Sequence, residues 1–126
     1  MNQTILIVDD EPSVRKTVRR ALCDQFDVLE ADDGESAVRM AATHHPNLII
    51  MDILMPGKDG YTALAEIKRN PSLTNIHVIM LTALTQDLNA KFAEALGAVG
   101  YLMKPIQLAI LRLKVNQVLG VSGGAK

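Results

Sequence analysis

Residues 4–12, which read TILIVDDEP, predict a buried β-strand that ends in carboxylates and leads directly into a helix. The apolar, mostly β-branched run at 4–8 is typical of a strand that is covered on both faces. Pro12 is suited to the first turn of a helix, because the N–H group it lacks has no partner there. This succession of strand, polar corner and helix is the repeating unit of a parallel α/β sheet.

The same succession recurs four more times along the chain. Further strands are expected at 27–31, 48–51, 76–81 and 100–103. Amphipathic or capped segments predict helices over 12–22, 37–42, 61–67, 88–96 and from Pro105 to about Leu119. Regular alternation favours an α/β fold with a doubly wound, five-stranded parallel sheet and five helices. The expected strand order is the flavodoxin-like 2-1-3-4-5.

Length and composition indicate a single domain with no unusual charge. The chain has 126 residues and a net charge of -1, which predicts no direct binding to nucleic acid and no membrane association. Its one cysteine, Cys23, and the lack of a signal-like start favour the reducing cytoplasm. We expect a domain at 1–120, followed at 121–126 by a disordered tail or linker stub.

Chemically active side chains stand at or just past the carboxyl ends of four of these strands. They are Asp9 and Asp10, then Asp52, Thr82 and Lys104. In open α/β sheets, ligands bind at this edge, near the point where the strand order reverses. The predicted order therefore brings three carboxylates, one hydroxyl and one amine into one pocket.

The chemistry of this set indicates a metal-assisted phosphoryl site. Two like charges ~4 Å apart repel by about 4 kcal/mol at an effective dielectric near 20, so clustered carboxylates need a cation or shared protons. Hard oxygen ligands without histidine or cysteine at ligand spacing favour Mg²⁺ over Zn²⁺. A hydroxyl and an ammonium suit phosphate oxygens. A carboxylate in such a site can act as the nucleophile and form an aspartyl phosphate.

Five segments carry a resemblance to a known family: ILIVDDEP, EADDGESAV, PNLIIMDILMPGKDGY, HVIMLTAL and ALGAVGYLMKP. Together they make the chain from Thr4 to Leu119 resemble the receiver domain of bacterial two-component response regulators, the chemotaxis-regulator-like family. The resemblance implies a phosphorylation-dependent signalling switch. It also implies that the chain is a phosphoacceptor and not an enzyme in the ordinary sense, although it assists its own phosphorylation and dephosphorylation.

The resemblance assigns a role to each acidic residue. Asp52 is expected to accept phosphate from a sensor histidine kinase or a phosphotransfer protein. Asp10 would bind Mg²⁺ directly and Asp9 through water, and the main-chain carbonyl of Leu54 would complete the protein ligands. Glu11 lies beside this set and is interpreted as a solvated loop acid.

The resemblance also implies a route for the signal. Thr82 would hydrogen-bond the phosphoryl group and move inward, and Lys104 would pair with a phosphoryl oxygen. The peptide bond between Lys104 and Pro105 is expected to be cis. Tyr101 matches the aromatic residue whose rotamer follows the threonine; the alternative is a partly buried aromatic on an edge strand.

Leucines flank the expected path of an attacking water molecule. Leu54 stands two residues after Asp52, and Leu84 stands two residues after Thr82, where polar residues are frequent in the family. Such side chains orient water poorly, so we hypothesise slow autodephosphorylation.

The last helix carries two apolar stripes. One consists of Leu111, Val115, Val118 and Leu119 and is expected to face the sheet. The other consists of Ile106, Ile110 and Leu113. A second apolar stripe suggests a partner, so we expect the face made by 88–96, 100–103 and this helix to bind a downstream target, an output domain or a second copy. The alternative is one wide core stripe with scattered exposed leucines.

Three other functions fit a similar sheet less well. A metal-dependent phosphatase needs a further acid two residues after its nucleophile, where this chain has Leu54. A flavin-binding protein needs a phosphate-binding loop after the first strand, where Asp9, Asp10 and Glu11 would repel phosphate. A pseudo-receiver that only binds partners would not need the intact acidic set.

Overall fold

A five-stranded parallel sheet forms the centre of the protein in the computed structural model, which describes residues 2–83 and 90–120. The strand order is β2-β1-β3-β4-β5, and all neighbouring pairs are parallel. The strands are β1 (Thr4–Val8), β2 (Asp27–Ala31), β3 (Leu48–Asp52), β4 (His77–Thr82) and β5 (Gly100–Met103). The predicted order and strand positions are confirmed.

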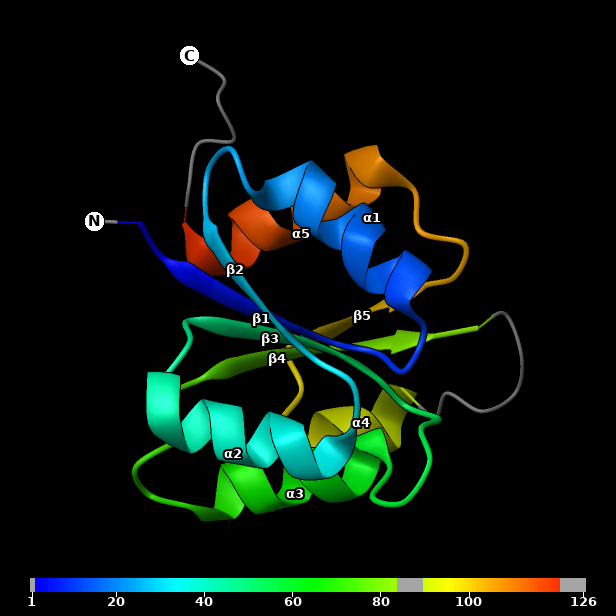
Figure 1. Ribbon diagram of the computed structural model, residues 1–126. Coiled ribbons are helices and arrows are strands. Elements are labelled where there is room, and N and C mark those ends of the chain that lie inside the picture. Colours follow the sequence, from blue (N-terminus) through cyan, green and yellow to red (C-terminus); the bar gives the residue numbers. More distant parts are fainter. Residues whose placement is uncertain (1, 84–89, 121–126) are drawn as a thin grey trace.

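Helices cover both faces of the sheet (Figure 1). They are α1 (Pro12–Leu22), α2 (Gly34–His44), α3 (Gly60–Arg69), α4 (Ala90–Ala95) and α5 (Leu108–Leu119). Helices α1 and α5 lie on one face, and α2, α3 and α4 lie on the other. This is the predicted doubly wound arrangement. Within the described residues, none of the helices has the length and apolar character needed to cross a membrane.

Two apolar layers hold the sheet between its helices. Ile5 and Ile7 of β1 belong to the layer under α1 and α5, and Leu6 and Val8 belong to the layer over α2 and α3. All four side chains are fully buried. Because β1 is covered on both faces, it is continuously apolar instead of alternating with polar residues.

Local hydrogen bonds start the helices that follow β2 and β3. The side chain of Asp33 accepts from the N–H of Ser36 at 2.7 Å, and the side chain of Asp59 accepts from the N–H of Thr62 at 2.8 Å. Both are N-caps, which satisfy amide groups in the first helical turn. A Cβ at Gly60 would collide with the main-chain carbonyl oxygen of Asp52, so α3 starts in close contact with the end of β3.

The last helix starts later than the sequence predicts. Helix α5 begins at Leu108 and not at Pro105, because the backbone of Gln107 is extended. Ile106 therefore precedes the helix; it is half-buried and packs against the core instead of continuing the second apolar stripe. Several predicted features lie outside the described residues: Leu84, the start of the helix expected at 88–96, and the tail at 121–126.

Candidate functional site

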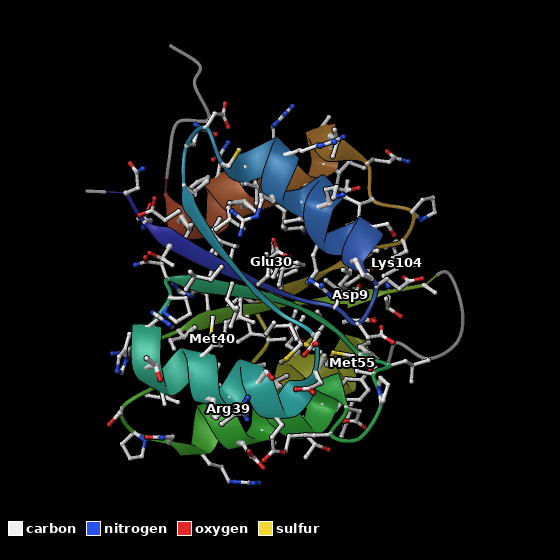
Figure 2. All side chains as sticks on the ribbon, in the orientation of Figure 1. Asp9, Glu30, Arg39, Met40, Met55 and Lys104 are labelled. Atoms are coloured by element: carbon white, nitrogen blue, oxygen red, sulfur yellow. The ribbon has the colours of Figure 1, made fainter. Side chains whose placement is uncertain are left out.

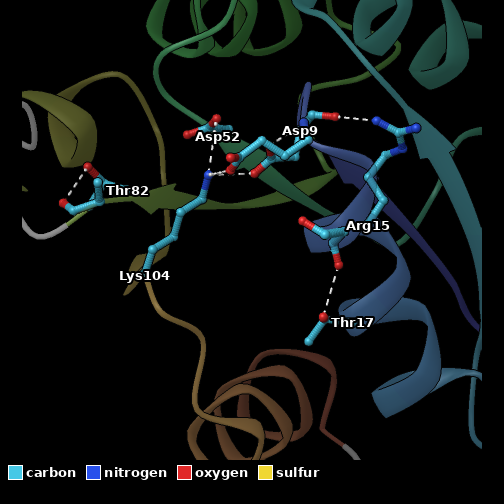
Figure 3. A network of polar contacts seen from close by, with 9 residues as sticks. Asp9, Arg15, Thr17, Asp52, Thr82 and Lys104 are labelled. Carbon is cyan, nitrogen blue, oxygen red and sulfur yellow. Dashed lines mark hydrogen bonds and ion pairs between the residues drawn. The ribbon is translucent and has the colours of Figure 1, made fainter.

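The predicted polar residues meet at the carboxyl edge of the sheet (Figure 3). Asp9 directly follows β1, Asp52 ends β3, Thr82 ends β4 and Lys104 directly follows β5. The main-chain N–H of Lys104 donates to the carbonyl oxygen of Thr82 at 2.6 Å, which ties the ends of β4 and β5 together. Four separate parts of the chain thus place side chains at one edge.

Three carboxylates form a cluster that could hold a cation. Asp9, Asp10 and Asp52 each offer an oxygen, and these oxygens lie within 4.8 Å of one another. Asp9 is fully buried, Asp52 is 6% exposed and Asp10 is exposed. Asp9 Oδ2 is buried and lies 2.9 Å from Lys104 Nζ, so this carboxylate already attracts one cation. An all-oxygen set that is partly open to water fits Mg²⁺, which usually keeps several water ligands.

The ammonium group of Lys104 provides positive charge at this cluster. Lys104 Nζ lies 2.9 Å from Asp9 Oδ2, 3.2 Å from Glu11 Oε1 and 3.4 Å from Asp52 Oδ2. Glu11 was expected to be a solvated loop acid, and its side chain is indeed 60% exposed, yet it contacts this lysine. Lys104 could also bind a phosphoryl group, because its ammonium can exchange one of these carboxylate oxygens for a phosphoryl oxygen.

Burial and neighbouring charge shift the ionisation of these groups. Burial, followed by the negative charge of Asp9, raises the pKa of Asp52 to about 6, although Lys104 opposes the shift. Burial also raises the pKa of Asp9, against the opposing effect of Lys104. Burial would lower the pKa of Lys104, but its ion pairs with Asp9, Asp52 and Glu11 outweigh this and raise it. The site therefore favours a bound cation over bare negative charge.

Hydrogen bonds from outside the cluster hold Asp9 in place. Its N–H donates to the carbonyl oxygen of Ala31 at 3.1 Å, and its Oδ1 accepts from the N–H of Glu11 at 2.9 Å. Its carbonyl oxygen accepts from Arg15 Nη1 at 2.8 Å (Figure 3). Arg15 also pairs with Glu30, which Figure 2 shows on the α1 side of the sheet. No motif in the sequence predicts this contact, and only the i,i+4 spacing of Arg15 and Arg19 hints at it.

The residues expected to carry the signal occupy different positions around the site. Thr82 is buried, and its hydroxyl donates to the carbonyl oxygen of Ala83 at 3.2 Å. Tyr101 is 44% exposed on the edge strand β5. The peptide bond between Lys104 and Pro105 is cis. Leu54, two residues beyond Asp52, has an exposed side chain.

The expected partner face is partly apolar and exposed. In α5, Leu111 and Val115 are fully buried against the sheet, while Ile110 and Leu113 are 47% and 59% exposed. A cavity of about 400 Å³ lies between β5 and α5. Its lining includes Tyr101, Pro105, Ile106 and Ile110. The structure thus separates a core stripe from an exposed stripe on α5.

Comparisons with known proteins agree with this geometry. The sequence model of the response regulator receiver domain matches residues 5–116. Chemotaxis protein CheY of Halobacterium salinarum is 37% identical over 120 residues, which cover 94% of this chain and 98% of that protein. Response regulator PleD of Caulobacter vibrioides is 34% identical over 119 residues, 94% of this chain.

A solved structure shows the same fold. Chemotaxis protein CheY4 of Vibrio cholerae superimposes with a TM-score of 0.87 at 28% identity, over 94% of this chain and 99% of that one. The lengths of the relatives differ: the aligned region spans 26% of PleD and about half of several others. The chain belongs to the response regulator receiver domain family of two-component signalling, whose members are phosphoacceptor domains that act as phosphorylation switches.

Proposed function

We propose that Asp52 accepts a phosphoryl group from a sensor histidine kinase or a phosphotransfer protein. The observation that carries this proposal is the position of its carboxylate, at the end of β3, inside the acidic cluster and 3.4 Å from Lys104. An Asp52 oxygen attacks phosphorus, the phosphorus–nitrogen bond of the donor phosphohistidine breaks, and the imidazole leaves with that electron pair. The product is an aspartyl phosphate.

The acidic cluster is proposed to hold Mg²⁺ for this transfer. Asp9, Asp10 and Asp52 would supply carboxylate oxygens and Leu54 its main-chain carbonyl oxygen. When bound, the ion offsets negative charge on the phosphoryl oxygens and the carboxylates, which is the main requirement of phosphoryl transfer. The convergence of the three carboxylates, whose oxygens lie within 4.8 Å of one another, supports this assignment.

Lys104 and Thr82 are proposed to bind oxygens of the new phosphoryl group. Phosphorylation adds about -1.5 to -2 charge units, so Lys104 exchanges one of its carboxylate contacts for a phosphoryl oxygen. Thr82 exchanges its hydrogen bond to Ala83 for another phosphoryl oxygen. Movement of Thr82 then changes the environment of Tyr101 on β5, and the local charge change reaches the surface of the domain.

The outgoing signal is proposed to leave through the face of α4, β5 and α5. Exposed Tyr101, Ile110 and Leu113 support this choice because a partner would cover apolar surface there. The partner is a downstream protein, an output domain or a second copy of the chain. An output domain is consistent with the greater length of relatives such as PleD.

Loss of the phosphoryl group is proposed to be slow. A water molecule must attack phosphorus so that the bond from Asp52 to phosphorus breaks and inorganic phosphate leaves. Leu54, which is 59% exposed near this path, offers no hydrogen bond to orient that water.

The test is labelling of the purified protein by acetyl phosphate with Mg²⁺, followed by intact mass. The wild-type protein should gain one phosphoryl group, and Asp52→Asn should gain none. Asp24→Asn changes an exposed acid away from the site and serves as the matched control, which should label fully. Stoichiometric labelling of Asp52→Asn would refute the assignment.

A further inference from the structure

Arg15 contacts the acidic cluster through the main chain of one of its members. Its Nη1 donates to the carbonyl oxygen of Asp9 at 2.8 Å, and its Nε donates to Glu30 Oε1 at 2.9 Å. Its side chain is only 18% exposed. One guanidinium in α1 therefore joins the loop after β1 to the neighbouring strand β2.

These contacts fix the peptide groups on both sides of Asp9. The N–H of Asp9 donates to Ala31 of β2, and its carbonyl oxygen is held by Arg15, which is itself held by Glu30 of β2. Because a peptide group is planar, fixing the carbonyl of Asp9 also fixes the amide from which Asp10 begins. The directions of two carboxylates in the cluster thus depend on two adjacent residues of β2.

The shape of the arginine side chain suits this role. Its rigid, planar guanidinium can donate to two acceptors at once from fixed directions, which a lysine ammonium does not reproduce. Glu30 accepts from both Arg15 and Arg19, at 2.9 and 2.7 Å, and so keeps the positive charge of Arg15 on the β2 side of the loop. Without Glu30, Arg15 would be free to turn towards the carboxylates and compete with a metal ion.

We propose that Arg15 is a positioning residue for the cation site, and that Glu30 orients it. The identity of the cation as Mg²⁺ rests on the proposed function. Arg15 itself binds no cation; it holds the Asp9–Asp10 peptide so that both carboxylates converge with Asp52. This makes the contact between α1 and β2 a determinant of metal affinity.

Arg19 is a matched control within the same helix. It lies one turn after Arg15, pairs with the same glutamate and donates to the carbonyl oxygen of Val28 at 2.9 Å. Its hydrogen bonds run to β2 and not to the loop after β1. Arg15→Ala and Arg19→Ala therefore remove the same charge and one ion pair each, but only Arg15→Ala releases the carbonyl of Asp9.

The experiment is calorimetric titration of MgCl₂ into unphosphorylated protein, with urea unfolding of each variant in chelator. Loss of outer contacts of this kind weakens metal binding by about tenfold, so Arg15→Ala should raise the Kd for Mg²⁺ by about that factor. Arg19→Ala should leave it nearly unchanged. Simple charge removal predicts the opposite sign, because an acidic site with one fewer neighbouring cation should bind Mg²⁺ more tightly.

Further variants separate positioning from general destabilisation. Arg15→Lys keeps the charge and should still weaken Mg²⁺ binding, because an ammonium cannot span both acceptors; it replaces Arg15→Ala if that variant does not fold. Equal or tighter Mg²⁺ binding by both Arg15 variants, or equal weakening by Arg19→Ala, overturns the inference. Failure of the proposed function appears separately, as wild-type protein that takes up no phosphoryl group on Asp52.

Discussion

Among single residues, the properties of this site depend on which side chains are buried and which are exposed to water. Asp9 and Asp52 are buried carboxylates with raised pKa values, so they require positive charge nearby. The side chains of Leu54 and Tyr101, by contrast, are exposed. In the proposed function, the buried acids would favour gain of a phosphoryl group together with a metal ion, and the exposed Leu54 would disfavour its hydrolysis.

Replacing Leu54 should shorten the life of the phosphorylated state. In Leu54→Asn the new amide can hydrogen-bond a water molecule near Asp52. Positioned polar groups accelerate proton-transfer steps by about 10² or more, so we expect the rate of phosphate release to rise by about tenfold. The measurement is release of inorganic phosphate after rapid removal of acetyl phosphate.

Leu108→Asn is the control for this change, because Leu108 is an exposed leucine of α5 away from the acidic cluster. It should release phosphate at the wild-type rate. If Leu54→Asn also keeps the wild-type rate, or if the wild-type protein loses its label within seconds, the explanation for slow dephosphorylation is wrong.

At the scale of the element, the ends of strands and the starts of helices position the site. Gly60 opens α3 directly against Asp52, while Glu30 of β2 ties α1 to the sheet through two arginines. Neither Gly60 nor Glu30 belongs to the acidic cluster, although both contacts support residues of it. We therefore expect a change at Glu30 to lower stability in a pH-dependent way, and a change at Gly60 to lower it through overpacking.

The ion pairs of Glu30 should give a pH-dependent contribution to folding. Hydrogen bonds from Arg19, then from Arg15, lower the pKa of Glu30 in the folded protein. A lowered pKa stabilises the fold above the unfolded value of about 4.3, and this contribution is lost as pH falls through the folded value. Glu30→Gln should therefore cost about 0.5–1 kcal/mol at pH 7 and progressively less below pH ~4.

Urea unfolding of wild type, Glu30→Gln and Glu94→Gln across this pH range checks the sign. Glu94 is exposed on α4, so its variant should follow the wild type throughout. A difference for Glu30→Gln that grows as the pH falls would show that the ion pairs do not act as described.

Adding a single methyl group at Gly60 should destabilise the protein. The new Cβ of Gly60→Ala would meet the carbonyl oxygen of Asp52 and the Cα of Ile53, which are main-chain atoms that cannot turn aside. Overpacking of this kind costs about 1–3 kcal/mol. Gly100→Ala is the control, because its Cβ would only contact the flexible end of Lys114 at 3.8 Å. Equal urea midpoints for the two variants would contradict this account.

Sequence patterns predicted β1, β3 and β4 because each is a buried, mostly apolar run at whose end polar residues stand. The regular alternation of strands and helices predicted the strand order. These patterns also brought Asp9, Asp52 and Lys104 to one edge, since parallel strands end together. The start of α5 was predicted too early because proline is compatible with either a helix or an extended backbone. The contact of Arg15 with Asp9 and Glu30 was missed because it joins two strands through a helix and leaves no local pattern.

In the molecule as a whole, the acidic cluster and the exposed apolar face occupy different parts of the domain. The acidic cluster lies at the carboxyl ends of the strands, and the exposed residues of β5 and α5 lie at the end of the sheet that is formed by β5. Lys104 follows β5 directly and connects the two regions through the chain. In the proposed function, this connection would let a phosphoryl group at Asp52 influence surface that it does not touch.

Charging the apolar face should weaken association without unfolding the domain. Ile110→Glu with Leu113→Glu places two like charges where a partner would bury apolar surface, and each buried apolar side chain contributes about 1.5–3 kcal/mol. Self-association or target binding of the phosphorylated protein should therefore fall steeply. Light scattering measures the first, and a pull-down with and without beryllofluoride measures the second.

The matched control is Ala42→Glu with Thr43→Glu, which adds the same charge to exposed positions of α2. It should leave association intact. If the α5 variant binds itself and its targets as the wild type does, the face of β5 and α5 is not the output surface.

Direct mapping of the phosphorylated residue tests whether Asp52 is the phosphoacceptor. Borohydride reduction of protein treated with acetyl phosphate converts an aspartyl phosphate to homoserine, which peptide mass spectrometry locates. We expect homoserine at position 52 when Mg²⁺ is present, and no homoserine there in the presence of a chelator. Homoserine at another aspartate, or unmodified Asp52 in protein that has gained a phosphoryl group, would contradict it.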